Sequence, residues 1–148
     1  MITSDYIRGL IDGEGCFTFH TNKSLKDGKI IIRKIPAFLL QMHERDEYLV
    51  TSVRDFLKLK NKVYSHKLPN LVAKISGREK VYKRGKRSSL YVRDIGSLKN
   101  IIVPFFYKKL IGFKGFQLKE WIENIGNDEN VPDSYKLIYK LFKSGYYD

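Results

Sequence analysis

Cysteine and long apolar runs are scarce in this sequence, and each shortage excludes a class of protein. A single cysteine, Cys16, rules out a disulfide within the chain and a cysteine-based zinc site. Any metal ion must therefore be held by carboxylates, imidazoles or carbonyl oxygens, which suit hard cations. No apolar run approaches the roughly 18 residues that a membrane span requires. We therefore expect a soluble protein with no membrane partner.

Low-complexity linkers are also missing, and 148 residues suffice for one core of ordinary size. We predict a single domain over residues 1–148. The N-terminal segment resembles neither a secretory signal nor a transit peptide, so we expect the protein to act in the compartment of its synthesis. That compartment is the interior of a mitochondrion or chloroplast if an organelle genome encodes the chain, and the cytoplasm otherwise.

Acidic residues are outnumbered by basic ones. Lysine and arginine total 28 against 16 aspartates and glutamates, which gives a net charge of +12 and a pI near 9.7. Such an excess is typical of domains that bind a polyanion. Nucleic acid is the first candidate, and acidic membranes or ribosomes are the alternatives that charge alone leaves open.

Hydrophobic periodicity predicts the element order α-β-β-α-β-β-α-α-α, an α+β fold. Thr3 or Ser4 can cap a first helix that Gly13 and Gly15 end. Strands are expected over 16–22, 30–42, 62–66 and 71–76, and a basic hairpin over 78–95 with Gly85 near its turn. Further helices are expected over 45–59, 97–106, 113–125 and 134–142.

Alternation along residues 16–22 assigns Phe17 and Phe19 to one face and Thr18, His20 and Asn22 to the other. In the next strand Pro36 marks either a bulge or an edge position. The facing of the residues after it therefore stays open, with Ile31, Ile35 and Leu39 on a possible outward face.

The stretch "IRGLIDGEG", residues 7–15, places acids where helix physics does not favour them. Asp12 and Glu14 lie near the negative end of the helix macrodipole, which costs a few tenths of a kcal/mol. Gly9 lies in mid-helix, at a cost of roughly 0.5–1 kcal/mol relative to alanine. Gly9 and Gly13 are four residues apart, on one helical face where a second helix can approach closely.

This stretch resembles the nine-residue motif of the LAGLIDADG homing endonucleases, with Arg8 at the free second place. The similarity continues, in the family's order, through "PAFLLQMHERDEYLV", "LYVRDIGSLKNIIVPFF" and "LIGFKGFQLKEWIE". The resemblance implies an α-β-β-α-β-β-α core with a saddle-shaped antiparallel sheet over DNA and an extra C-terminal helix. It also implies a site-specific double-strand endonuclease that cuts a long pseudo-palindromic target in intron homing.

Only one copy of the motif occurs, so the resemblance implies a homodimer. Its interface is expected to include Ile7, Gly9, Leu10, Asp12 and Gly13. Glu14 is the expected metal ligand, with the backbone carbonyl of Gly13 beside it, whereas Asp12 is expected to be structural or to support the ligands. Mg²⁺ is the expected ion because it needs only one or two protein carboxylates. We expect Mn²⁺ to replace it, and Ca²⁺ to support binding but not cleavage.

Three further positions follow from the resemblance. Lys114 matches a lysine that lies near the scissile phosphate, where it can stabilise charge in the transition state; the alternative is a lysine that anchors a phosphate or is simply solvated. Gln41 or Met42 falls where relatives place a polar residue that positions water, and the open register leaves the choice between them. His43 is a weaker candidate, with a simple exposed residue as the alternative.

DNA recognition is expected from the outward face of the sheet, because a two-stranded ribbon fits the major groove. The candidate contacts are Thr18, His20, Asn22, Lys23, Arg33, Lys67, Lys74, Arg78, Arg84, Arg87, Tyr91 and Arg93. Two alternative functions remain: a maturase that binds its host intron RNA, and a DNA-binding regulator without catalysis. No small-molecule substrate is expected.

Overall fold

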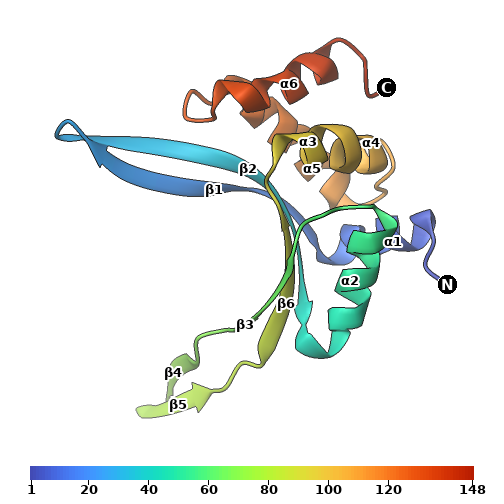
Figure 1. Ribbon diagram of the computed structural model, residues 1–148. Helices are drawn as coiled ribbons and strands as arrows, with labels where there is room; N and C mark the ends of the chain where they lie inside the picture. The colour runs from blue at the N-terminus through green and yellow to red at the C-terminus, as the bar shows by residue number, and fades with distance from the viewer.

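The fold is organised around a curved four-stranded antiparallel sheet, with helices on one face and the other face open (Figure 1). The computed structural model describes residues 1–148. The strand order is β1 (Gly15–Lys26), β2 (Lys29–His43), β6 (Lys86–Val92) and β3 (Val63–Lys67). A second, two-stranded sheet consists of β4 (Leu71–Ile75) and β5 (Arg78–Tyr82).

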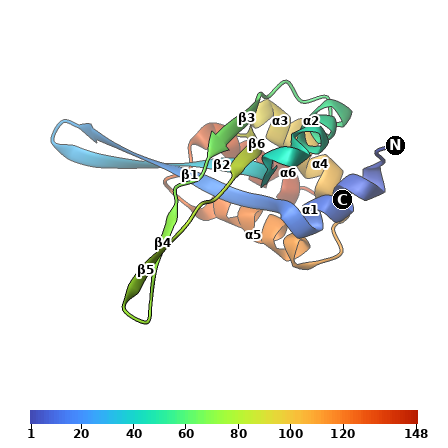
Figure 2. The same ribbon diagram turned by 90° about the horizontal axis from the view of Figure 1, so that it is seen from below.

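Six helices cover the closed face and its edges (Figures 1 and 2). Their bounds are α1 Ser4–Glu14, α2 Glu47–Phe56, α3 Ile95–Ser97, α4 Val103–Phe106, α5 Phe113–Asn127 and α6 Lys136–Lys143. A π-helical turn, Leu98–Ile102, joins α3 to α4 without a break. No helix is both long enough and apolar enough to span a bilayer. The mixed α+β order and the antiparallel sheet agree with the predicted fold class.

One hydrophobic core of 21 buried residues extends from Ile7 in α1 to Ile138 in α6. Aromatic rings form its centre between the sheet and the helices. The Phe17 ring lies 5.5 Å from Phe38 and 5.7 Å from Trp121, measured between centroids. Since aromatic residues each bury a large apolar area, this cluster fixes the helices against β1 and β2.

The prediction of a basic hairpin over 78–95 with its turn near Gly85 is wrong. The chain reverses at Ser76–Gly77 between β4 and β5, where φ is +52° and +75°. Gly85 lies instead on the connection from β5 to β6, where a β-carbon would come within 2.8 Å of Nε2 of His43. Ser–Gly supports the positive φ angles of a two-residue hairpin turn, whereas Gly85 serves a close approach.

Pro36 marks an edge position, not a bulge. The register of β1 and β2 runs unbroken from Lys26↔Lys29 to Gly15↔Leu40. Pairing of β2 with β6 begins only at Phe38, so Pro36 lies where β2 has one neighbouring strand. Its missing N–H therefore removes no hydrogen bond of the sheet ladder.

Candidate functional site

The open face of the sheet consists of alternate residues of its strands. Thr18 and His20 alternate along β1 with Phe17 and Phe19, whose rings pack against Trp121 of α5. The predicted alternation of β1 is therefore confirmed. The predicted residues that share this open face are Asn22 on β1 and Ile31, Arg33, Ile35 and Leu39 on β2.

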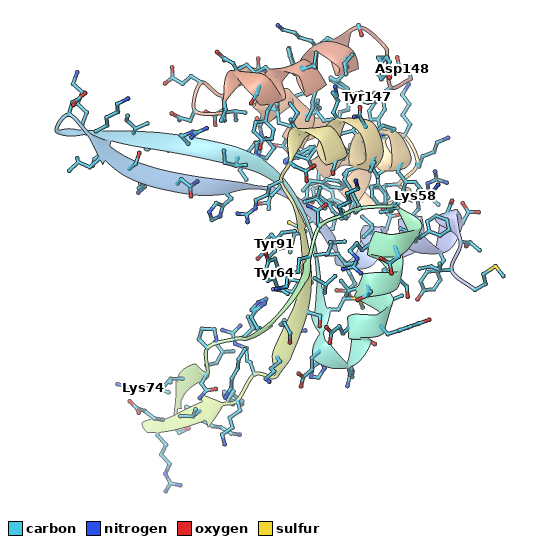
Figure 3. The ribbon with its side chains drawn as sticks, viewed as in Figure 1. Lys58, Tyr64, Lys74, Tyr91, Tyr147 and Asp148 are labelled. Carbon is cyan, nitrogen blue, oxygen red and sulfur yellow. The ribbon has the colours of Figure 1, made fainter.

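Strands β6 and β3 extend the open face. Tyr91 of β6 pairs with Leu39, and Arg87 pairs with His66 of β3. Figure 3 shows Tyr64 and Tyr91 on the side of the sheet away from α2. The structure thus brings six predicted contact residues onto one face: Thr18, His20, Asn22, Arg33, Arg87 and Tyr91.

The other predicted contact residues lie elsewhere. Lys74 and Arg78 are exposed on the β4–β5 ribbon, which projects from the body (Figures 1 and 3). Lys23 and Lys67 alternate with the open-face residues and are exposed on the opposite side of the strands. Their contact with nucleic acid stays a prediction.

Two arginines are held by contacts within the chain. Arg84 donates from Nε to the carbonyl oxygen of Pro69 at 2.9 Å, so it links the two connections that lead into the β4–β5 ribbon. The Arg93 guanidinium lies 5.7 Å from the centre of the Tyr91 ring. The carbonyl oxygen of Arg93 accepts a hydrogen bond from the Tyr135 hydroxyl at 2.6 Å. Burial, and the nearby Asp94 carboxylate, raise the pKa of this tyrosine, which therefore keeps its donor proton.

Glu14 ends α1 at the edge of the open face. Its side chain and the adjacent Gly13 are exposed. The last carbonyl groups of a helix lack intrahelical partners and carry partial negative charge, so this end of α1 favours a cation. One exposed carboxylate beside the backbone carbonyl of an exposed glycine fits an ion that keeps most of its waters, as Mg²⁺ does. No group of three or more metal-binding side chains occurs in the chain.

Asp12 connects α1 to the beginning of α5. One carboxylate oxygen accepts from the backbone N–H of Ile111 at 3.0 Å, and the other accepts from Gly112 at 3.1 Å. Both oxygens therefore hold the segment that leads into α5. This contact agrees with the expectation of a structural Asp12.

Lys114 lies in the first turn of α5, directly after the segment that Asp12 holds. Two more hydrogen bonds fix α5 against β1: Phe17 N donates to Gln117 Oε1 at 3.2 Å, and Trp121 Nε1 donates to the carbonyl of Thr18 at 2.7 Å. Lys114 shares a helical face with Gln117 and Trp121, since the spacing of three and seven residues returns to one side. The lysine is therefore placed on the side of α5 that faces the start of β1, the strand that follows Glu14 in the chain.

Gln41 and Met42 face opposite sides of β2, which resolves the choice that the sequence left open. Gln41 is on the open face, where its Nε2 donates to Ser89 Oγ at 3.0 Å. Met42 packs against the hydrophobic core on the closed face. The proposed water-positioning role of Met42 therefore has no structural basis, because the sheet separates its side chain from the open face.

His43 is engaged locally. Its Nδ1 accepts from the backbone N–H of Arg45 at 3.1 Å, and this contact caps the turn before α2. The contact accounts for a histidine at the end of β2 without a catalytic role.

The glycine face of α1, defined as Gly9 and Gly13, is exposed. A β-carbon added at either glycine would meet no atom of the chain within 4 Å. Leu10 is half-buried at the border of this face. Ile7, also expected at the interface, is fully buried in the core of its own chain. Its side chain is therefore not part of the exposed face, because it lies on the opposite side of the helix.

Sequence reasoning did not find the two open-face residues that contact Gln41. His66 of β3 places its Nε2 3.2 Å from Nε2 of Gln41, and Ser89 of β6 lies between their strands with its side chain fully buried. The alternation of the two faces along the strands "KVYSHK" and "KRSSLYV" is the feature of the sequence that could have placed both residues on the open face. Their neighbours across the sheet depend on strand pairings that a single sequence does not specify.

The fold and this site define a class of α+β proteins with a basic, concave sheet and one acidic helix end at its edge. The model of the LAGLIDADG endonuclease family matches residues 7–125. The chain therefore belongs to the LAGLIDADG endonuclease family. No curated protein sequence matches the chain significantly.

Three solved structures illustrate the similarity in fold. The homing endonuclease I-TnaI is 19% identical, with a TM-score of 0.56 over 97% of this chain and 97% of its own. The meganuclease I-SmaMI, bound to uncleavable DNA, is 22% identical with a TM-score of 0.59 over 95% of this chain. The LAGLIDADG homing endonuclease I-GzeII, in complex with its DNA target, is 20% identical with a TM-score of 0.57 over 96% of this chain. This chain spans 44% of I-SmaMI and 42% of I-GzeII.

Proposed function

We propose that this protein is a site-specific double-strand DNA endonuclease that acts as a homodimer with divalent metal ions at a long pseudo-palindromic target. The observation that carries the proposal is the position of Glu14. Its free carboxylate ends α1 at the edge of the open basic face and one residue beyond the exposed Gly13. The relatives I-SmaMI and I-GzeII bind DNA, and I-SmaMI has been captured on uncleaved DNA with calcium ions.

The open face supports DNA as the partner. Its two ribbons, β1–β2 and β4–β5, project from the sheet as basic arms (Figure 2). Arginine and lysine on a ribbon can read guanine in the major groove, and asparagine can read adenine. Many of these side chains will contact phosphate and fix the register on the duplex. The net charge of +12 predicts binding that weakens steeply with salt.

In the cleavage mechanism, Glu14 and the Gly13 carbonyl would hold a divalent metal ion, which would supply an activated water and neutralise phosphoryl charge. Lys114, on the side of α5 that faces the start of β1, would stabilise the negative charge that develops on the phosphoryl oxygens. Gln41, on the open face, orients the attacking water through its amide. Asp12 keeps α5, and with it Lys114, fixed to α1.

Homodimerisation completes this site. One chain supplies one Glu14, and cutting both strands requires two active sites. Packing of the two glycine faces brings the C-terminal ends of two α1 helices together, and with them two Glu14 carboxylates. The exposed Gly9 and Gly13 support this arrangement because small residues allow two helix backbones to approach closely.

The test uses wild-type protein, Glu14→Gln and the control Glu129→Gln, an exposed acid in the loop between α5 and α6. Each is incubated with host genomic DNA that lacks this reading frame, in Mg²⁺ or Ca²⁺, and the DNA ends are sequenced. We expect one Mg²⁺-dependent staggered cut, lowered about 100-fold or more in Glu14→Gln because a ligand of the catalytic ion is lost. Glu129→Gln is expected to cut like wild type.

Binding in Ca²⁺ is expected to survive the Glu14→Gln change. If Glu14→Gln unfolds or loses the dimer, Glu14 is structural and the assignment is wrong. If folded, dimeric wild-type protein produces no discrete ends, a maturase function becomes the better hypothesis, and binding of host intron RNA is then measured.

A further inference from the structure

Gln41 occupies the position on the open face that lies nearest to Glu14 along the strand register. The last pair of the β1–β2 ladder is Gly15↔Leu40, so Glu14 and Gln41 each lie one residue beyond this pair. The two side chains therefore belong to the same edge of the sheet, where α1 ends and β2 approaches His43.

Both N–H groups of the Gln41 amide are directed to acceptors within the chain. One donates to Ser89 Oγ at 3.0 Å, and the other faces Nε2 of His66 at 3.2 Å. Donation to His66 requires an unprotonated Nε2, with the ring proton on Nδ1. The Gln41 oxygen is then the part of the amide left to interact with a molecule outside the chain.

We propose that His66 is a positioning residue that fixes the orientation of the Gln41 amide, so that its oxygen faces the water at the cleavage site. This inference rests on the proposed endonuclease function. His66 acts from the third strand of the sheet and touches neither the metal ion nor the phosphate. Its role is to remove one of the two orientations that an amide can adopt.

The orientation matters because the oxygen of the amide accepts a hydrogen bond from water, whereas the NH₂ group donates one to water. A carbonyl oxygen accepts a hydrogen bond from water and turns a lone pair of the water toward phosphorus, whereas an NH₂ group donates to that lone pair and occupies it. Ser89 alone does not select one of the two orientations of the Gln41 amide, because a hydroxyl both donates and accepts hydrogen bonds. His66 Nε2 does select one when the ring proton is on Nδ1, because in that tautomer Nε2 only accepts a hydrogen bond.

The test compares His66→Leu, which removes the acceptor, with His66→Gln, which returns an acceptor oxygen at a similar reach. Ser65→Ala is the control, because Ser65 is the preceding residue on β3 and faces the other side of the sheet. Single-turnover cleavage is measured with saturating protein in Mg²⁺, and DNA affinity is measured in Ca²⁺. We expect His66→Leu to cut about 3- to 10-fold more slowly, the range that one ordinary hydrogen bond supports.

Affinity is expected to change less than 2-fold, since the effect is on the chemical step, and His66→Gln is expected to restore most of the rate. If wild type cuts and His66→Leu cuts equally fast, the inference is wrong while the endonuclease function stands. If His66→Gln stays as slow as His66→Leu, the defect is structural and the inference is also wrong.

A second measurement does not depend on cleavage. The side-chain amide protons of Gln41 are observed by nuclear magnetic resonance in wild type and His66→Leu. Loss of the His66 acceptor should shift the resonance of one of the two amide protons upfield. The resonance of the proton donated to Ser89 Oγ should stay unchanged. Unchanged amide resonances in His66→Leu would overturn the inference about His66, whether or not the protein cuts DNA. A shifted resonance in a protein that does not cut DNA would contradict only the proposed function.

Discussion

Lys34 holds the unpaired edge of β2 in two ways. Its Nζ donates to Asp128 Oδ2 at 2.8 Å, and its backbone N–H donates to the Asn130 carbonyl at 3.0 Å. The loop after α5 thus takes the place of a neighbouring strand just beyond the end of β6. The hydrogen bond from Lys34, followed by one from the Asn130 N–H, lowers the pKa of Asp128 below its usual 3.8.

A carboxylate with a lowered pKa stabilises the fold above its unfolded pKa, and this contribution is lost as the pH falls through the folded value. We expect Lys34→Met to lower the free energy of unfolding by about 0.5–1 kcal/mol at pH 7, since both side chains are partly exposed. The deficit should shrink below about pH 4. Urea unfolding at pH 7 and pH 3 measures it. An equal deficit at both pH values would show that the ion pair is not the cause.

Residue-level prediction succeeded where alternation along one strand fixes the side to which a residue faces, as it does for Phe17 and Thr18 on β1. The hydrogen-bond partners of Asp12 are Ile111 and Gly112, 99 and 100 positions away, and the sequence alone does not show this contact. The choice between Gln41 and Met42 was not readable from the sequence either, because Pro36 left the strand register open. The turn at Asp27–Gly28 fixes that register, so a two-residue hairpin loop at this Asp-Gly carried the missing signal.

At the scale of elements, the contact between α1 and α5 is the one that positions the site. We expect Asp12→Ala to lower the free energy of unfolding by about 0.5–2 kcal/mol, because two exposed hydrogen bonds from Ile111 and Gly112 are lost. Cleavage should fall further than DNA affinity, because α5, which carries Lys114, is no longer held to α1 by these hydrogen bonds. Thermal unfolding and single-turnover cleavage are compared with Asp5→Ala, a fully exposed acid of the same helix with a side chain 99% accessible. Equal effects of the two changes would contradict this role.

The helices and the first two strands could be predicted because each buries one face. Leu118, Trp121 and Ile125 return to one side of α5, and all three are buried. The β4–β5 hairpin has no buried face, with Val72 and Val81 exposed at 61% and 56%. Without burial there is no alternation of apolar and polar residues to read, so its turn was placed at the wrong glycine.

At the scale of the whole molecule, the exposed glycine face makes a prediction about assembly. Gly9→Leu adds a side chain into open space in the single chain, and leucine has a helix propensity higher than that of glycine by up to about 1 kcal/mol. We expect the monomer to remain folded while the dimer dissociates. Light scattering should report half the mass of wild type, with Gly9→Ala intermediate because its methyl group is small. An unchanged mass for Gly9→Leu would contradict packing through this face.

The motif predicted the family, which the family model confirms, but not the geometry of the open face. That geometry depends on long-range pairings such as β2 with β6, between residues about fifty positions apart in the chain. The glycine face likewise has one property that the sequence predicts and one that it does not. Its spacing is visible in sequence, whereas the burial of Ile7 on the opposite side depends on how α1 docks on the core.

Trp121 is the only tryptophan of the chain and is 2% exposed. Its indole N–H holds the Thr18 carbonyl, one residue from the aromatic centre of the core and directly beneath the open face. The chain also contains 10 tyrosines, so excitation selective for tryptophan confines the recorded fluorescence to this single position beneath β1. A distortion of β1 that changes this hydrogen bond or the polarity around the indole should therefore change the tryptophan emission, and no added label is needed to observe it.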